Sequence, residues 1–152
     1  LSSCVFSIMA AKIGDVDKAY DYFMETARLD LDNTHGNTRD GLHLANMGGT
    51  WMAIVFGFAG LRIKEDGLGF APVIPRQWKA YAFKVRYRGR LIAVRVEQAD
   101  GGNGGTDAGM SVARFELLEG DGLEIRVHGE TRKLEPGVPV KVEAEAGAVC
   151  RG

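Results

Sequence analysis

The chain has 152 residues, of which 45% are hydrophobic and 26% are charged, and its formal net charge at pH 7 is −1. This composition is typical of globular proteins, and the length suits one domain or two small ones. The near-neutral balance argues against nucleic acid or a membrane surface as a partner, because both favour a clustered basic excess. Cys4 and Cys150 lie near opposite ends, so we expect reduced thiols in a cytoplasmic protein, with no metal site and no cofactor.

The first sixty residues predict helices. The chain opens inside a helix expected from about Ser3 to Ile13, without an initiator methionine, so we expect a segment of a longer protein. A second helix is expected after Asp15, which is placed to cap it. The apolar residues of this second helix recur at helical spacing: Val16, Ala19, Tyr20, Phe23 and Ala27. The short link predicts that the two helices pack antiparallel.

A polar loop, "LDNTHGNTRDG", precedes a third helix expected from about His43 to Gly60. The stretch 44–61 contains no ionisable side chain. Its length of eighteen residues approaches that of a membrane span, but its glycines and the absence of flanking basic clusters argue against one. Two compatible interpretations remain. The helix is a fully buried element of a larger helical protein, and its first turn, with His43, Gly48 and Gly49, presents donors to an anion.

From residue 64 onward the apolar residues alternate, which predicts strands. Apolar side chains occupy every second position in three segments: Tyr81 to Tyr87, Ile92 to Val96 and Leu123 to Val127. A fourth such segment contains Val138, Val140 and Val142, and Arg88-Gly89-Arg90 is expected to turn the first segment into the second. Several short alternating strands predict an antiparallel sandwich. The glycine-rich loop 99–110 interrupts them and contains no phosphate-binding motif.

Most polar and aromatic candidates have ordinary structural interpretations. His35 and His128 are expected in solvent, and Asp40 is expected to brace the loop before His43. Gly48 and Gly49 could equally serve close helix packing. Trp51 and Trp78 are expected to anchor the core and the domain interface. The glutamates of the strand region are expected on solvated faces, without a paired acid and base.

The words "TRDGLH", "GGTW", "GFAGLR" and "RGRL" occur in this order within residues 1–96. Together they resemble the C-terminal part of glycoside hydrolase family 65, the maltose, trehalose and kojibiose phosphorylases. The resemblance implies an α+β fold, with the terminal helices of an (α/α)6 barrel followed by a small antiparallel β-sandwich. Residues 1–62 would then belong to the barrel and residues 63–152 to the sandwich.

The resemblance also implies inverting phosphorolysis, in which inorganic phosphate cleaves an α-linked glucose disaccharide to give β-glucose 1-phosphate. The reaction requires a general acid and a phosphate held on the opposite face of the sugar. In the family this acid is a glutamate upstream of the segment, so no catalytic residue is expected here. His43 matches the family's phosphate-contacting histidine, Gly48 and Gly49 would line the same cavity, and Ser2 would mark the end of a serine-rich phosphate loop.

Two other functions stay open at this stage. The segment could be a non-catalytic structural module that closes a helical barrel or holds a homodimer together. The parent could also be a hydrolase of the same family, in which water replaces phosphate. A hydrolase needs a carboxylate base where phosphate would lie, so a histidine at position 43 favours the phosphorylase.

Overall fold

The computed structural model describes residues 2–33, 36, 38–99 and 110–145. The predictions for His35 and Cys150, and for most of the loop 99–110, therefore fall outside the described residues. The helical elements are α1 (Ser2–Lys12), α2 (Val16–Ala27), α3 (Leu29–Asp32), the 3-10 turn η1 (Thr38–Asp40), α4 (Leu44–Met52) and the π-helical turn η2 (Ala53–Phe58). The strands are β1 (Arg62–Lys64), β2 (Gly67–Phe70), β3 (Ala80–Tyr87), β4 (Arg90–Gln98), β5 (Met110–Glu119), β6 (Leu123–Val127), β7 (Glu130–Leu134) and β8 (Val140–Glu145).

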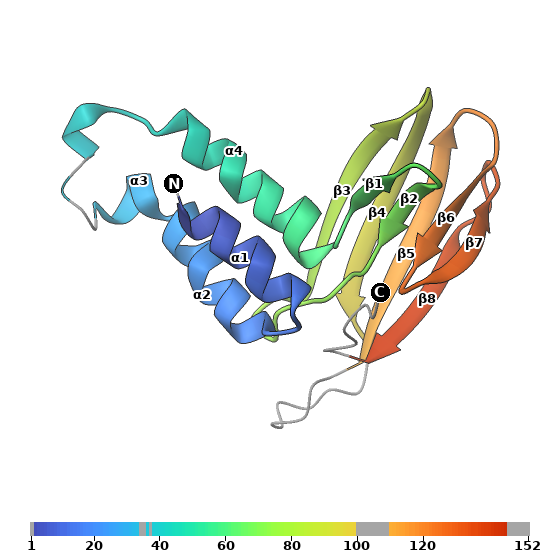
Figure 1. The fold of residues 1–152 in the computed structure, drawn as a ribbon, viewed down its shortest axis with the longest axis horizontal. Helices are drawn as coiled ribbons and strands as arrows, with labels where there is room; N and C mark the ends of the chain where they lie inside the picture. The colour runs from blue at the N-terminus through green and yellow to red at the C-terminus, as the bar shows by residue number, and fades with distance from the viewer. Residues whose placement is uncertain (1, 34–35, 37, 100–109, 146–152) are drawn as a thin grey trace.

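Helices α1 and α2 form the expected antiparallel pair (Figure 1). Gly14 has a φ of 87°, which permits the reversal between them. The side chain of Asp15 then accepts a hydrogen bond from the backbone N of Lys18 at 3.1 Å, as the capping prediction requires. The buried hydroxyl of Ser7 donates to the carbonyl of Ala19 at 2.8 Å and ties the two helices together.

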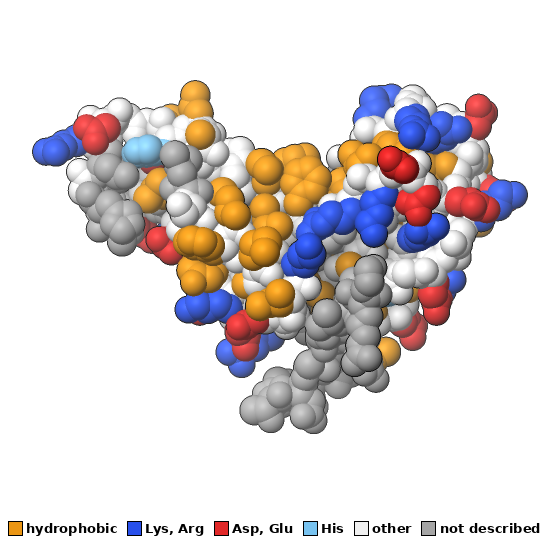
Figure 2. All heavy atoms as spheres, viewed as in Figure 1, with side chains coloured by type: hydrophobic (Ala, Val, Ile, Leu, Met, Phe, Trp, Pro, Cys, Tyr) orange, Lys and Arg blue, Asp and Glu red, His pale blue; other side chains and the backbone are white. Residues whose placement is uncertain are grey.

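The uncharged stretch forms α4 and continues into η2, so the predicted third helix is present. Within the described chain the helix is not buried on all sides, so its burial in a larger helical protein stays a prediction. Its inner side includes Val55 and Phe58, both 0% exposed, whereas Leu44 is 72% and Trp51 is 50% exposed. The described chain supplies packing partners on one side of the helix only, and Figure 2 shows hydrophobic side chains spread over the helical half. No described helix is long and apolar enough to cross a bilayer.

The strand region forms two four-stranded sheets, with strand orders β1-β2-β6-β7 and β3-β4-β5-β8 (Figure 1). Their inner faces share one hydrophobic cluster, in which the rings of Phe70 and Phe115 lie 5.0 Å apart. The sheets are antiparallel except at one pair, because β2 and β6 run parallel. The chain passes through the other sheet between these two strands, so no hairpin forces them to be antiparallel.

The predicted hairpin of β3 and β4 is confirmed. Arg88 and Gly89 form its turn with φ values of 46° and 77°, as a two-residue turn with left-handed residues requires. The inward residues of β4 are at most 1% exposed: Ile92, Val94 and Val96. Those of β3 are only half-buried, since β3 lies at the edge of its sheet.

Trp78 joins the helical half to the sheets, as predicted. Its ring lies 5.0 Å from the rings of both Phe23 and Phe58, and 6.0 Å from that of Tyr81. The hydroxyl of Tyr81 donates to the carbonyl of Val73 at 2.9 Å, and burial raises the pKa of this phenol well above its usual value. This contact region connects the helical cluster to the core of the sheets.

The prediction for His128 is wrong, because its ring is not solvated. Strand β6 ends at Val127, and His128 adopts a φ of 50° in the following turn, so the alternation of the strand no longer sets its direction. Both ring nitrogens are buried, and burial lowers the pKa of the imidazole.

Candidate functional site

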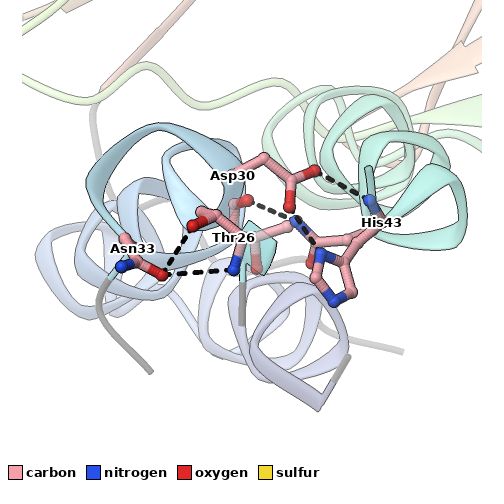
Figure 3. A network of polar contacts seen from close by, with 6 residues as sticks. Thr26, Asp30, Asn33 and His43 are labelled. Carbon is pink, nitrogen blue, oxygen red and sulfur yellow. Dashed lines mark hydrogen bonds and ion pairs between the residues drawn. The ribbon is translucent and has the colours of Figure 1, made fainter. Parts of the chain in front are cut away.

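The predicted site lies where α2, α3 and α4 meet (Figure 3). Asn33 ends α3 in the left-handed conformation, with a φ of 49°. Its side-chain oxygen accepts hydrogen bonds from the backbone N of Thr38 at 3.1 Å and from the Thr38 hydroxyl at 2.8 Å. An asparagine side chain that accepts such hydrogen bonds takes the place of a backbone carbonyl and so closes the loop. The end of α3 is thereby joined to the short turn that leads to His43.

Asp30 holds His43 with both oxygens of its carboxylate (Figure 3). The backbone N of His43 donates to Oδ2 at 2.9 Å, and the ring Nδ1 lies 2.5 Å from Oδ1. The Asp30 side chain is 11% exposed and the His43 side chain 30%. The two hydrogen bonds from His43 lower the pKa of the Asp30 carboxyl. The ring of His43 is therefore fixed at the start of α4 by an ionised partner.

Sequence reasoning selected the wrong aspartate for this role. Asp40 was expected to brace the loop, but its side chain is 65% exposed and lies 3.8 Å from that of Arg39. Asp30 is thirteen residues from His43, and α3 spans a single turn. No periodic pattern relates the two positions, so the chain alone offered no local signal for their contact.

Asn46 anchors the first turn of α4 from the other side. This side chain is buried, and its Nδ2 donates to the backbone carbonyl of Thr26 at 2.5 Å. Thr26 belongs to the last turn of α2, so the bond joins the end of one helix to the start of another. A buried amide with a satisfied partner holds the two elements in one arrangement.

The two glycines of the motif have different surroundings. A Cβ on Gly49 would lie 2.8 Å from Sγ and 3.0 Å from Cβ of Cys4, so this glycine permits close packing of α1 on α4. A Cβ on Gly48 would meet no atom within 4 Å among the described residues, and Gly48 is exposed. The packing interpretation therefore accounts for Gly49, and helix packing within the described chain does not require a glycine at position 48.

Ser2 is exposed in the first turn of α1. Cys4, two residues later, contacts Gly49, so the start of α1 lies beside α4. The place of Ser2 near α4 is compatible with a shared site, and its role stays a prediction.

A cleft of the described chain lies elsewhere. It encloses about 530 Å³ between the helices and the β1–β2 hairpin, and Lys12, Arg62, Lys64 and Arg126 line it. Figure 2 shows Lys and Arg side chains along this junction. Arg62 donates to two carbonyls, those of Phe56 and Leu61, at 2.6 and 2.7 Å. None of the predicted phosphate residues lines this cleft, and the described residues include no cluster suited to a metal ion.

Comparison with known proteins gives two family matches. The sequence model of the glycosyl hydrolase family 65 central catalytic domain matches residues 1–52. The model of the C-terminal domain of the same family matches residues 61–100.

Individual relatives match over most of this chain. An alpha,alpha-trehalose phosphorylase from Geobacillus stearothermophilus is 58% identical over 149 residues, which cover 98% of this chain and 18% of that protein. A kojibiose phosphorylase from Thermoanaerobacter brockii is 42% identical, with 89% of this chain and 16% of that protein covered. A maltose phosphorylase from Bacillus subtilis is 41% identical, with 89% of this chain and 16% of that protein covered.

A solved structure, a putative kojibiose phosphorylase from human microbiome, matches with a TM-score of 0.80 and 32% identity. The match covers 96% of this chain and 20% of that one. The chain thus spans a fifth or less of the length of these relatives.

Proposed function

The chain belongs to glycosyl hydrolase family 65, and from this membership we propose that it forms the C-terminal part of an inverting disaccharide phosphorylase. The proposed enzyme cleaves an α-glucosidic bond with inorganic phosphate and releases β-glucose 1-phosphate. The observation that carries the proposal is the 58% identity to a protein named as a trehalose phosphorylase over 98% of the chain. Trehalose is accordingly the first substrate to test.

The exposed apolar residues of the helices support a place within a larger helical barrel. Several large apolar side chains of α1, of the residue that follows it and of α4 are between 42% and 72% exposed: Val5, Phe6, Met9, Ile13, Leu44, Met47, Trp51 and Met52. So much exposed apolar surface marks a contact with other protein. We assign residues 1–62 to the last helices of an (α/α)6 barrel and residues 63–152 to the sandwich that follows it.

His43 is the proposed phosphate ligand, with Gly48, Gly49 and Ser2 beside it. The start of α4 offers backbone N–H groups and the positive end of the helix dipole, both of which favour an anion. The open space beside Gly48 leaves the backbone accessible there. A phosphate dianion in apolar surroundings requires such donors, because an unpaired buried charge is costly.

The proposed general acid is a glutamate outside this chain, and the mechanism needs no cofactor. The segment would hold phosphate on one face of the glucosyl unit while the acid protonates the leaving oxygen on the other. We further propose a cytoplasmic homodimer for the full-length enzyme. Two alternatives apply. This segment by itself would be a non-catalytic structural module, and the whole protein would be a hydrolase of the same family in which water replaces phosphate.

The test uses the full-length protein that contains this segment. Release of glucose 1-phosphate from trehalose, maltose and kojibiose is measured as a function of phosphate concentration. His43→Ala should raise the KM for phosphate and lower the rate on the order of 10²-fold, or about 2.7 kcal/mol, if one hydrogen bond to transition-state charge is lost. Thermal melting should change less.

Arg28→Ala is the control, because the Arg28 side chain pairs with Asp32 and both side chains are about half exposed. It should leave the phosphate kinetics close to those of the wild type. Wild-type cleavage whose rate does not depend on phosphate would overturn the phosphorylase proposal. Unchanged phosphate kinetics in His43→Ala would show that His43 does not belong to the site.

A further inference from the structure

Asp30 has no assigned role in the proposed reaction, yet its carboxylate holds the ring of His43, the proposed phosphate ligand. Oδ2 accepts from the backbone N of His43 at 2.9 Å, and Oδ1 lies 2.5 Å from Nδ1. The two contacts restrain both the backbone and the ring of the same residue. The far edge of the ring, which carries Nε2, points away from Asp30 (Figure 3).

The chemistry of this pair determines where the protons lie. An ionised carboxylate can only accept hydrogen bonds, so Nδ1 must carry the hydrogen between the two side chains. A neutral ring with its hydrogen on Nδ1 has a bare lone pair on Nε2. Such a ring cannot donate to phosphate through Nε2. Donation from that side requires a second proton, and the ring is then an imidazolium.

We propose that Asp30 is a positioning residue that makes His43 bind phosphate as an imidazolium, with Nδ1–H held by Asp30 and Nε2–H donated to the anion. This inference rests on the proposed phosphorylase function. The bound state then contains one proton more than a neutral ring and a phosphate dianion. That proton arrives either with monobasic phosphate or from solvent, and no other reactant is needed.

Charged side chains of α3 and η1 form pairs of their own within the described chain. Asp32 of α3 pairs with Arg28 at the end of α2, 2.6 Å away. Asp40 of η1 lies near Arg39, and both side chains are mostly exposed. From α4 and α1, the neighbouring side chains are those of Asn46 and Cys4. The carboxylate of Asp30 contacts His43 directly.

Proton uptake gives the proposal a kinetic signature. Over the pH range in which phosphate binding takes up one proton, the KM for phosphate should rise with pH by up to about tenfold per unit, as linkage requires. The KM for the disaccharide should not follow this slope.

Asp30→Asn is the decisive variant, measured in the full-length protein. The amide can accept from the backbone N of His43 with its oxygen while its NH₂ donates to Nδ1. The ring then carries its hydrogen on Nε2 while neutral, and it binds the dianion without taking up a proton. The KM for phosphate should rise about tenfold near neutral pH, as for loss of one charge-assisted bond. Its slope with pH should flatten, and the KM for disaccharide should stay within about twofold.

Asp32→Asn is the matched control, since Asp32 lies in the same short helix but pairs with Arg28. It should leave both KM values and the slope unchanged.

Adding Asp30→Asn to His43→Ala should raise the phosphate KM no further than His43→Ala does, because Asp30 acts through the ring. If Asp30→Asn melts below the assay temperature, Asp30→Ser, which keeps one acceptor, replaces it and should also raise the phosphate KM selectively.

The outcomes separate the two proposals. Wild-type cleavage that does not depend on phosphate overturns both of them. Phosphate-dependent cleavage in which the Asp30 variant behaves like the Asp32 variant overturns only the role of Asp30. Effects of the Asp30 and His43 substitutions that multiply independently also overturn it, as does an equal rise in both KM values.

Discussion

At the residue scale, Gly49 tests the requirement for close helix packing, and Gly48 tests the proposed role in phosphate binding. Gly49→Ala should destabilise the protein by about 1–3 kcal/mol, because overpacking forces neighbours to move, and the new Cβ would meet Cys4 at 2.8 Å. Gly48→Ala meets nothing within 4 Å among the described residues. It should raise stability by about 0.5–1 kcal/mol, since alanine favours the helix over glycine. Denaturant unfolding of the two variants measures both changes.

The same pair tests the proposed phosphate site. If Gly48 lines it, Gly48→Ala should raise the KM for phosphate in the full-length protein despite the gain in stability. Adding Cys4→Ala to Gly49→Ala should recover part of the lost stability, because it removes the sulfur that the new Cβ approaches. A stable Gly48→Ala variant with wild-type phosphate kinetics would contradict the assignment of Gly48 to the site.

At the element scale, β4 and β5 form a ladder whose ends meet across the glycine-rich loop 99–110. Gln98 pairs with Ser111, and the backbone N of Ala99 donates to the carbonyl of Met110 at 2.8 Å. Replacing residues 100–109 with an Asn-Gly turn should therefore preserve the ladder. The melting temperature should hold or rise slightly, because loop-closure entropy changes slowly with loop length. A fall of many degrees, or lost activity in the full-length protein, would show that the loop has a further role.

Regular patterns in the sequence predicted the regular elements well. The helical spacing around Phe23, the cap at Asp15 and the turn at Arg88-Gly89 all depend on neighbours in sequence, and all three are present. Strands β1, β2, β5 and β7 and the parallel pairing of β2 with β6 were missed. The pairing depends on which segments meet in space, and the shortest strands display too few alternating residues to be recognised. In β5 a polar residue, Ser111, occupies a buried position and interrupts the apolar alternation.

The candidate site shows the same division between local and distant information. His43 stands out because a specific motif surrounds it, whereas Asp30 becomes visible only through a contact across thirteen residues. The prediction of a solvated His128 was wrong because it continued the alternation of β6 to a residue one position past the end of the strand. Sequence reasoning thus found the candidate ligand of the site, and the structure added the residue that holds it.

At the scale of the whole molecule, two hydrophobic clusters meet at Trp78. One contains the helices and the other the sheets, and Trp78 packs against both. The sheet cluster draws its fully buried residues mainly from β2, β4, β5, β6 and β7. The helical cluster is smaller and receives Val73 and Trp78 from the segment that links β2 to β3. The helices therefore depend on the strand region for part of their core, whereas Val55 of η2 is the only helical residue among the described buried members of the sheet cluster.

This asymmetry predicts how the two halves behave when separated. Residues 61–152, expressed alone, should fold into a monomer with the circular dichroism of a β protein, because β1 is retained and the inner faces of both sheets remain together. Residues 1–60 alone should not form a stable monomer. Those residues lose Val73 and Trp78, and they already expose large apolar side chains, Leu44 at 72% and Phe6 at 51% among them. The helices of this fragment are few and share a single apolar side, so they cannot bury that surface among themselves. Size-exclusion chromatography and thermal melts of the two fragments, with the 152-residue chain as the reference, measure the difference. A monomeric, cooperatively melting helical fragment beside an unfolded strand fragment would contradict both the proposed boundary and the dependence of the helices on Trp78.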